Sequence, residues 1–505
     1  MSNMRVEVVT GPVRYRIAPL IALILLTLVP VLALTALLVW SDGQADEHEA
    51  ALAAGSDEAP TARPGGAAAP ALTTALMAYR RAPEQVGALA DDVRLSDAMD
   101  QIAAFVGEGS CLAVSVDGRP VTAHNADTAV IPASTHKLLV AAVALEALGP
   151  DYRFTTSVVA PAPVDGVIEG DLVLVGGGDP LLVSAGFRTD DDPFPEFNTT
   201  PLDSLADAVV AAGVTSIAGS VLGDGSRYDD EFVNPSWGPD VAFTDAGPYD
   251  ALVVNDARTV GRSGRQRDPN DAAAREFARL LAARDVRVAN GSDAGFADPS
   301  LPVLASIDSE PLTAVLAEML TTSDNDTAEM LLKELGVADS GEGTVAAGLN
   351  VVDRTLRGWG VPMDGVRLVD ASGLSSENRL TCAALLAVLQ HVEGTAVADG
   401  LALAGRTGTL EDAFVGSPME GRLVAKTGSL GNPPDDLDPP AVKGLAGFLE
   451  TDSGRTIEFV LVLNAPTIDE EEFYEPYWAA LGERLAAYPA GPERALVGPQ
   501  TVVEE

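Results

Sequence analysis

A serine and a lysine three residues apart are the first side chains in this chain that could do chemistry together. Ser134 and Lys137 lie in the run IPASTHK, where Pro132 and Ser134 are helix-start residues. Residues three apart on a helix share a face, so the amine can reach the hydroxyl. A serine hydroxyl becomes an effective nucleophile when a neighbouring base takes its proton. We therefore predict Ser134 as nucleophile and Lys137 as its base; the alternative is a helix-capping serine beside a surface lysine.

Two more short motifs carry the same kind of chemistry. Ser323-Asp324-Asn325 offers a hydroxyl for proton relay at Ser323 and an amide for holding substrate at Asn325, although such clusters usually serve turns and helix caps. Lys426-Thr427-Gly428 follows the apolar run GRLVA. A cation and a hydroxyl at a strand end can bind a substrate carboxylate, and a glycine lets a ligand approach the backbone. The alternative is an ordinary glycine-containing strand end, as we expect for Arg406-Thr407-Gly408.

The scarcity of lysine strengthens this interpretation. Lys137, Lys333, Lys426 and Lys443 are the only lysines, and every other basic residue apart from the histidines is arginine. Arginine stays protonated and cannot act as a base, whereas a lysine among apolar or cationic neighbours can lose its proton. In a chain that otherwise uses arginine, a lysine therefore indicates a position where the chemistry can require an amine that loses its proton.

The elements that must position these residues follow from hydrophobic patterning. Apolar alternation and turn residues predict strands at CLAVSV (Cys111–Val116), GRLVAKTG, LAGFLET and TIEFVLVLN, with a hairpin turn at 452–454. A helix from Ser134 to the stop at Gly149 is apolar nearly all round, which is typical of a buried helix. Further helices are expected after Asn325, near Leu380 and over about 474–488, and Asp326 with Glu329 could cap the first of these.

These elements predict an α/β domain in two pieces, residues 81–154 and 303–487, whose first and last parts must meet. Residues 155–302 have short β-like runs such as DLVLV and SIAGSVLGD, punctuated by Gly, Pro and Asp. We expect this segment to be a largely β insert. Residues 488–505 are expected to be a short polar tail.

The N-terminus predicts a membrane anchor. Ile17 to Trp40 holds no charged residue, and at ~1.5 Å per residue it would form a helix of roughly 36 Å, enough to cross a bilayer. Arginines precede it and acids follow it, which places residues 1–16 in the cytoplasm and the rest outside. Residues 41–80 are rich in Ala, Gly, Pro and acids and are expected to be a flexible linker. The alternative is a cleaved signal peptide, whose apolar stretch is usually shorter.

Composition excludes some partners. The 505 residues carry a formal net charge of -42, so nucleic acid and anionic lipid would be repelled. We see no metal-binding or cofactor motif and expect neither group. Cys111 and Cys382 each lie in an apolar run, and we favour two small buried side chains over a disulfide, which the compartment would permit.

The order S-x-x-K, S-D-N, K-T-G is that of penicillin-binding proteins and class A β-lactamases. Together with LVGGGDPLL, DASGLSSENRLT, AGRTGTLEDAF and AKTGSL, it makes residues 85–485 resemble the S13 family of D-alanyl-D-alanine carboxypeptidases/endopeptidases, which includes the PBP4-type, class C low-molecular-mass penicillin-binding proteins. The resemblance implies a penicillin-binding/β-lactamase-like transpeptidase domain, an antiparallel sheet flanked by helices, with a large insert between the first and second motifs. The long gap between Ser134 and Ser323 fits that family, and no E-x-x-x-N lies between Asn325 and Lys426 to support efficient lactam hydrolysis.

By this resemblance, Ser134 attacks the carbonyl between two D-alanines and Lys137 takes its proton, while Ser323 and Lys426 help to pass the proton to the leaving group. Asn325, Thr427, Gly428 and Ser429 would bind the substrate, and the backbone N–H groups of Ser134 and Ser429 would form the oxyanion hole. The expected partners are peptidoglycan stem peptides and β-lactam antibiotics, at the outer side of a bacterial cell membrane. A β-lactamase-like hydrolase and a non-catalytic wall-binding scaffold are the alternatives, and the balance of carboxypeptidase and endopeptidase activity stays open.

Overall fold

The computed structural model describes residues 82–103, 106–187, 195–238, 241–260, 264–431 and 439–489. The predicted cytoplasmic segment, membrane anchor and linker (residues 1–80) lie outside these ranges, as does the predicted tail beyond residue 489. Within the described ranges, no helix combines the length and the apolar character that a membrane crossing needs.

A six-stranded antiparallel sheet joins the two ends of the described chain. Its order is β13-β14-β15-β16-β1-β2, and β1 pairs with β16 from Cys111↔Val462 to Val116↔Ile457. The first and last parts of the domain therefore meet, as predicted. The strands are β1 (Cys111–Val116), β2 (Arg119–His124), β13 (Ala402–Leu403), β14 (Leu423–Leu430), β15 (Ala441–Glu450) and β16 (Thr456–Ala465).

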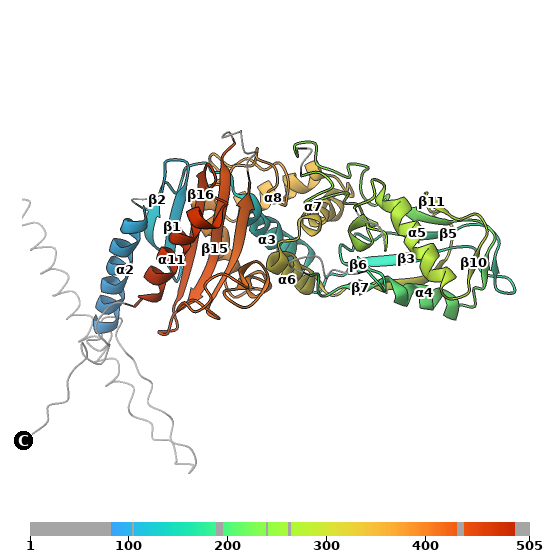
Figure 1. Ribbon diagram of the computed structural model, residues 1–505, viewed down its shortest axis with the longest axis horizontal. Helices are drawn as coiled ribbons and strands as arrows, with labels where there is room; N and C mark the ends of the chain where they lie inside the picture. The colour runs from blue at the N-terminus through green and yellow to red at the C-terminus, as the bar shows by residue number, and fades with distance from the viewer. Residues whose placement is uncertain are drawn as a thin grey trace, which may run out of the picture. The chain divides into compact units, whose positions relative to one another are not determined.

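Both faces of this sheet are buried, which explains the nearly continuous apolar run of β16. Phe459 and Leu461 point into one core, and Val460 and Val462 point into the other. Helices α2 (Ala82–Ala103) and α11 (Glu471–Ala486) cover the first face (Figure 1). The second face carries η1 (Ala133–His136), α3 (Lys137–Leu148), α6 (Leu312–Thr322), α7 (Asn325–Ser340), α8 (Val345–Gly358), α9 (Cys382–Val392) and α10 (Ala396–Asp399). The short helix η3 (Gly408–Leu410) contributes Leu410 to the core of the first face.

Two sequence-based expectations about this domain are wrong. Cys111 on β1 and Cys382 at the start of α9 form a disulfide, with a Cα–Cα distance of 5.9 Å. Both cysteines are fully buried, as expected, but sequence alone cannot show that the sheet and α9 bring them together. The cap of α7 is Asp324, whose side chain accepts from Thr327 N, because Asp326 and Glu329 are engaged elsewhere.

The insert has its own sheet and its own helices. A five-stranded sheet of order β11-β9-β5-β3-β12 includes parallel pairs, and α4 and α5 pack with it in a separate core. The expectation of a largely β insert thus understates its helices, and β12 extends its sheet beyond residue 302. The elements are β3 (Thr155–Val159), β4 (Val167–Ile168), β5 (Leu172–Val175), β6 (Leu182–Val183), β7 (Thr200–Pro201), α4 (Leu202–Ala211), β8 (Ser216–Ile217), β9 (Val221–Asp224), η2 (Asn255–Ala257), α5 (Pro269–Ala282), β10 (Arg287–Val288), β11 (Ser292–Ala294) and β12 (Val303–Asp308).

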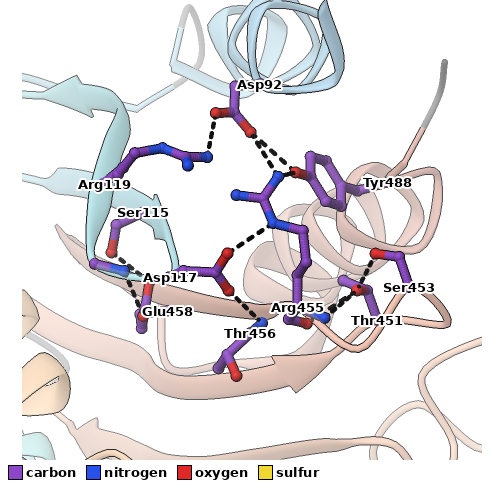
Figure 2. A network of polar contacts seen from close by, with 11 residues as sticks. Asp92, Ser115, Asp117, Arg119, Thr451, Ser453, Arg455, Thr456, Glu458 and Tyr488 are labelled. Atoms are coloured by element: carbon purple, nitrogen blue, oxygen red, sulfur yellow. Dashed lines mark hydrogen bonds and ion pairs between the residues drawn. The ribbon is translucent and has the colours of Figure 1, made fainter. Parts of the chain in front are cut away.

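A charged network fixes the first helix to the end of the large sheet (Figure 2). Asp92 on α2 accepts from Arg119 Nη2 at 2.6 Å and from Tyr488 Oη at 2.9 Å, and it lies 3.5 Å from Arg455 Nη1. Arg455 also donates to Asp117 in the β1–β2 turn at 2.7 Å. The network therefore ties α2 to the turns of two hairpins and to the chain after α11.

The disulfide gives a stability prediction. Cys111→Ala/Cys382→Ala should unfold at a lower denaturant concentration, with a loss of about 2–5 kcal/mol, because the bridge constrains a very long loop of the unfolded chain. Urea unfolding followed by circular dichroism measures this. Reductant present throughout the titration should destabilise the wild type and leave the double variant unaffected. Equal stability of the two oxidised proteins would contradict the prediction.

Candidate active site

The Ser134–Lys137 pair lies on a tight turn at the edge of the domain's helical layer. The segment Ala133–His136 is a 3₁₀ turn, and α3 begins at Lys137. Residues i and i+3 of a 3₁₀ turn lie one above the other, which brings the two side chains together. Lys137 Nζ donates to Ser134 Oγ at 2.9 Å. The predicted contact between nucleophile and base is therefore present.

Lys137 is fully buried and has three hydrogen-bond acceptors. Besides Ser134 Oγ, its Nζ donates to Asn325 Oδ1 at 2.7 Å and to Ser372 O at 2.8 Å. A lysine ammonium has three protons to donate, so every one of them has a partner. The three acceptors come from segments far apart in the chain, and the amine holds them at one point.

Burial makes this amine a usable base. It lowers the pKa of Lys137 to about 8, and the nearby carboxylates of Asp324 and Asp370 oppose that shift. A lysine in water is almost wholly protonated at neutral pH. A pKa of about 8 leaves a sizeable neutral fraction near physiological pH, as a general base needs.

Ser323 and Asn325 lie where α6 passes into α7. Ser323 ends α6 in the left-handed region, with φ 70°, so the chain turns sharply and Asp324 can cap α7. Asn325 uses its oxygen for Lys137, and its Nδ2 donates to the backbone oxygen of Asp245 in the insert at 2.9 Å. Burial, followed by the charges of Asp326 and Asp256, raises the pKa of Asp324 to about 7.

The strand with the third motif passes directly beside the serine turn. A Cβ added to Gly428 would lie 2.9 Å from Pro132 O, so a glycine is needed for this close approach. Gly428, predicted to contact the substrate, packs here against the turn that carries Ser134. Lys426 is fully buried, and its Nζ donates to Thr427 O at 3.1 Å. Burial, followed by the charge of Lys137, lowers the pKa of Lys426 well below its usual value.

These segments border one cavity of about 1350 Å³. Five of the predicted site residues line it: Ser134, Ser323, Asn325, Thr427 and Ser429. Thr427 and Ser429 are two apart on β14, so both point to the same side of the strand. The structure thus brings the three motifs to one place.

Further site residues were not assigned from sequence. The segment DASG, quoted for the resemblance but given no role, supplies Ser372 O to Lys137. Glu329 on α7 accepts from Ala371 N and Ser372 N, at 3.0 and 2.8 Å, and so fixes that carbonyl. Burial, followed by the charge of Asp370, raises the pKa of Glu329 to about 8. The segment is rich in polar residues, which is a weak sign of a functional site. No fixed spacing in the sequence links it to Ser134, so its contact with Lys137 could not be predicted.

Several other residues have structural roles. His136 Nδ1 lies 3.1 Å from Ala371 O, to which it donates, and burial lowers the pKa of its ring. Arg406 pairs with Glu420, and Gly408 fits closely against Thr321 O. Lys333 is buried and pairs with Asp229 of the insert at 2.6 Å. These contacts give His136, Arg406 and Gly408 structural partners, and they tie Lys333 to the insert.

Comparison with known proteins identifies the family. Residues 95–263 and 253–477 match the D-Ala-D-Ala carboxypeptidase 3 (S13) family. Carboxypeptidase Rv3627c of Mycobacterium tuberculosis is 33% identical over 67% of this chain and 72% of its own length. The D-alanyl-D-alanine carboxypeptidase of Actinomadura sp. (strain R39) is 26% identical over 75% of this chain and 80% of its own.

A solved structure agrees on the fold. The crystal structure of penicillin-binding protein 4 (dacB) from Haemophilus influenzae superposes with a TM-score of 0.64 at 19% identity, covering 77% of this chain and 99% of that one. The match of the family over most of the described residues, and the relative at 33% identity, lead to one conclusion: this chain belongs to the S13 family of D-Ala-D-Ala carboxypeptidases.

Proposed function

We propose that this protein is a serine-type D-alanyl-D-alanine carboxypeptidase, with or without endopeptidase activity, that acts on peptidoglycan stem peptides through an acyl-enzyme at Ser134. The observation that carries the proposal is the hydrogen bond between Lys137 Nζ and Ser134 Oγ, made by a fully buried amine whose pKa lies at about 8. The S13 family and its carboxypeptidase relatives support the same reaction.

In the proposed acylation step, neutral Lys137 takes the proton of Ser134 as Oγ attacks the carbonyl carbon between two D-alanines. The oxyanion that forms is held by the backbone N–H groups of Ser134 and Ser429, a kind of contact worth ~10²–10³ in rate for each donor. The C–N bond then breaks, and the leaving D-alanine takes a proton from Lys137 by way of Ser323. Lys426, whose pKa is lowered by burial and by the charge of Lys137, is assigned a part in the same proton transfer.

Substrate positioning is assigned to the residues that line the cavity. Asn325 would hold the substrate amide, and Thr427 and Ser429 would meet the terminal carboxylate. Water then hydrolyses the ester at Ser134. A β-lactam would acylate the same serine and leave slowly, and the H. influenzae protein has been solved in complex with a β-lactam.

We also propose that the domain works outside the cell membrane, held by residues 17–40. The uncharged run with arginines before it and acids after it supports an anchor. The Cys111–Cys382 disulfide supports an oxidising compartment. N-terminal sequencing of the membrane fraction tests this proposal: an intact start retains the anchor, and a new start beyond residue 40 removes it.

The base assignment predicts the behaviour of Lys137→Arg. This variant keeps the positive charge but should lose acylation, because arginine cannot accept the serine proton. Intact-mass time courses with benzylpenicillin measure the adduct, with Ser134→Ala as the control that removes its site. Near-normal acylation of Lys137→Arg would contradict the assignment.

The same time course separates the alternatives. A long-lived adduct that requires Ser134 supports the peptidase. A transient adduct with rapid loss of lactam would favour a β-lactamase, and a folded wild type that forms no adduct would favour a scaffold.

The pKa of Lys137 predicts a pH profile. The rate of acylation should rise with pH as the amine loses its proton and should level off above about pH 8. Asp324→Asn removes a carboxylate that raises the pKa of Lys137 and keeps a residue able to cap α7, so it should move the rise to lower pH. Acylation rates of both proteins from pH 5.5 to 9.5 measure this. An unmoved profile in Asp324→Asn would contradict the coupling.

A further inference from the structure

Lys443 is a lysine of the cavity wall that the proposed mechanism does not use. It lies on β15 directly opposite Ser429 on β14, so the two side chains share a face of the sheet. Its Nζ donates to Ser429 Oγ at 2.9 Å. The ammonium also lies over the rings of Tyr474 and Trp478 on α11, at 3.9 and 5.2 Å from their centres. Two aromatic rings and a hydroxyl therefore hold this side chain in place.

The charge of Lys443 stands out in the cavity. Among the described residues that line it, Lys443 is the only basic one. The carboxylates that line the same cavity are Asp245, Glu411, Asp412, Glu471, Glu475 and Glu483. These carboxylates, on a chain whose net charge is -42, disfavour a negatively charged substrate group in the rest of the cavity. A local cation is what such a group would need in order to bind.

Lys426 is poorly suited to supply that cation. It is fully buried, is absent from the cavity lining, and spends a hydrogen bond on Thr427 O. Burial lowers the pKa of both lysines, but the charge of Lys137 lowers that of Lys426 further, to well below its usual value, whereas the carboxylates of Asp469 and Glu471 oppose the shift at Lys443. Lys443 is half-buried and borders the open cavity, so its ammonium is the one that a ligand can reach.

The hydrogen bond to Ser429 also has a direction. A lysine ammonium can only donate, so Ser429 Oγ must accept from Lys443 and keeps its own proton for another partner. Ser429 lines the cavity and is exposed, so that proton is available to a ligand there. Thr427, by contrast, donates its hydroxyl proton to Thr409 Oγ1 at 2.8 Å. Of the two hydroxyls on this strand face, Ser429 is the one prepared to donate.

We propose that Lys443 is a specificity-determining residue, which together with the Ser429 hydroxyl binds the carboxylate of the leaving D-alanine. The ammonium supplies the charge, and it also orients the hydroxyl that completes the contact. This inference rests on the proposed acyl-enzyme reaction and deepens it, because it explains how a strongly acidic protein accepts a substrate that ends in a carboxylate.

The test compares benzylpenicillin with its methyl ester, in which a neutral ester replaces the carboxylate. Lys443→Met should lower the ratio of acid to ester acylation rates on the order of 10–100-fold, as expected for one lost charge-assisted hydrogen bond. The ester should react at an unchanged rate, and Lys443→Arg should recover most of the ratio. Arg422→Met is the matched control, since it removes a positive charge that pairs with Asp452 outside the cavity lining. Its ratio should equal that of the wild type.

A peptide readout follows the same logic. Lys443→Met should raise KM for a diacetyl-L-lysyl-D-alanyl-D-alanine substrate and should not affect hydrolysis of the corresponding D-alaninamide. An unchanged acid-to-ester ratio, or equal losses with acid and ester, in a variant with the wild-type melting temperature would overturn the assignment of Lys443. Failure of the wild type to form any adduct with either compound would instead overturn the acyl-enzyme reaction itself, and this inference with it.

Discussion

The catalytic centre depends on keeping one amine out of water. Lys137 Nζ is fully buried and donates to Ser134, Asn325 and Ser372, which belong to three separate segments. Burying such a group is unfavourable unless its protons have acceptors, so each segment must reach its place before the amine is tolerated. The apolar length of α3, the tight turn before it and the close passage of Gly428 are all conditions for that arrangement. The contacts that make Lys137 a base are therefore the same contacts that allow it to be buried.

The insert takes part in this arrangement. Asp245 O accepts from Asn325 Nδ2, and Gly247 N donates to Asp326 Oδ1 at 2.5 Å. Arg265 of the insert also pairs with Asp326, and Lys333 of α7 is tied to Asp229. Because these contacts hold both the first turn and the middle of α7, the insert fixes the position of the second motif. A segment that looks like an addition in the sequence is part of the support for Asn325.

Sequence patterns predicted the features that depend on residues close together in the chain. The spacing of Ser134 and Lys137 predicts their contact, and apolar runs between turn residues predict β1, β14, β15 and β16, whereas β2 and β13 of the same sheet were not predicted. The disulfide, the contact of Ser372 with Lys137 and the cap at Asp324 were missed or misassigned, because each depends on which distant segments become neighbours. Lys443 shows the same limit: its rarity marked it as informative, but only pairing with β14 places it beside Ser429.

The disulfide also decides what happens to the chain if it is cut. Ser134, Ser323 and the whole insert lie between Cys111 and Cys382, whereas Lys426 lies beyond them. A protease that cleaved one exposed loop of the insert would therefore leave two fragments still covalently joined through the β1–α9 bridge. The nucleophile and the strand with the third motif would remain on a single molecule. Damage to the exposed insert would then become visible as separate chains only after reduction.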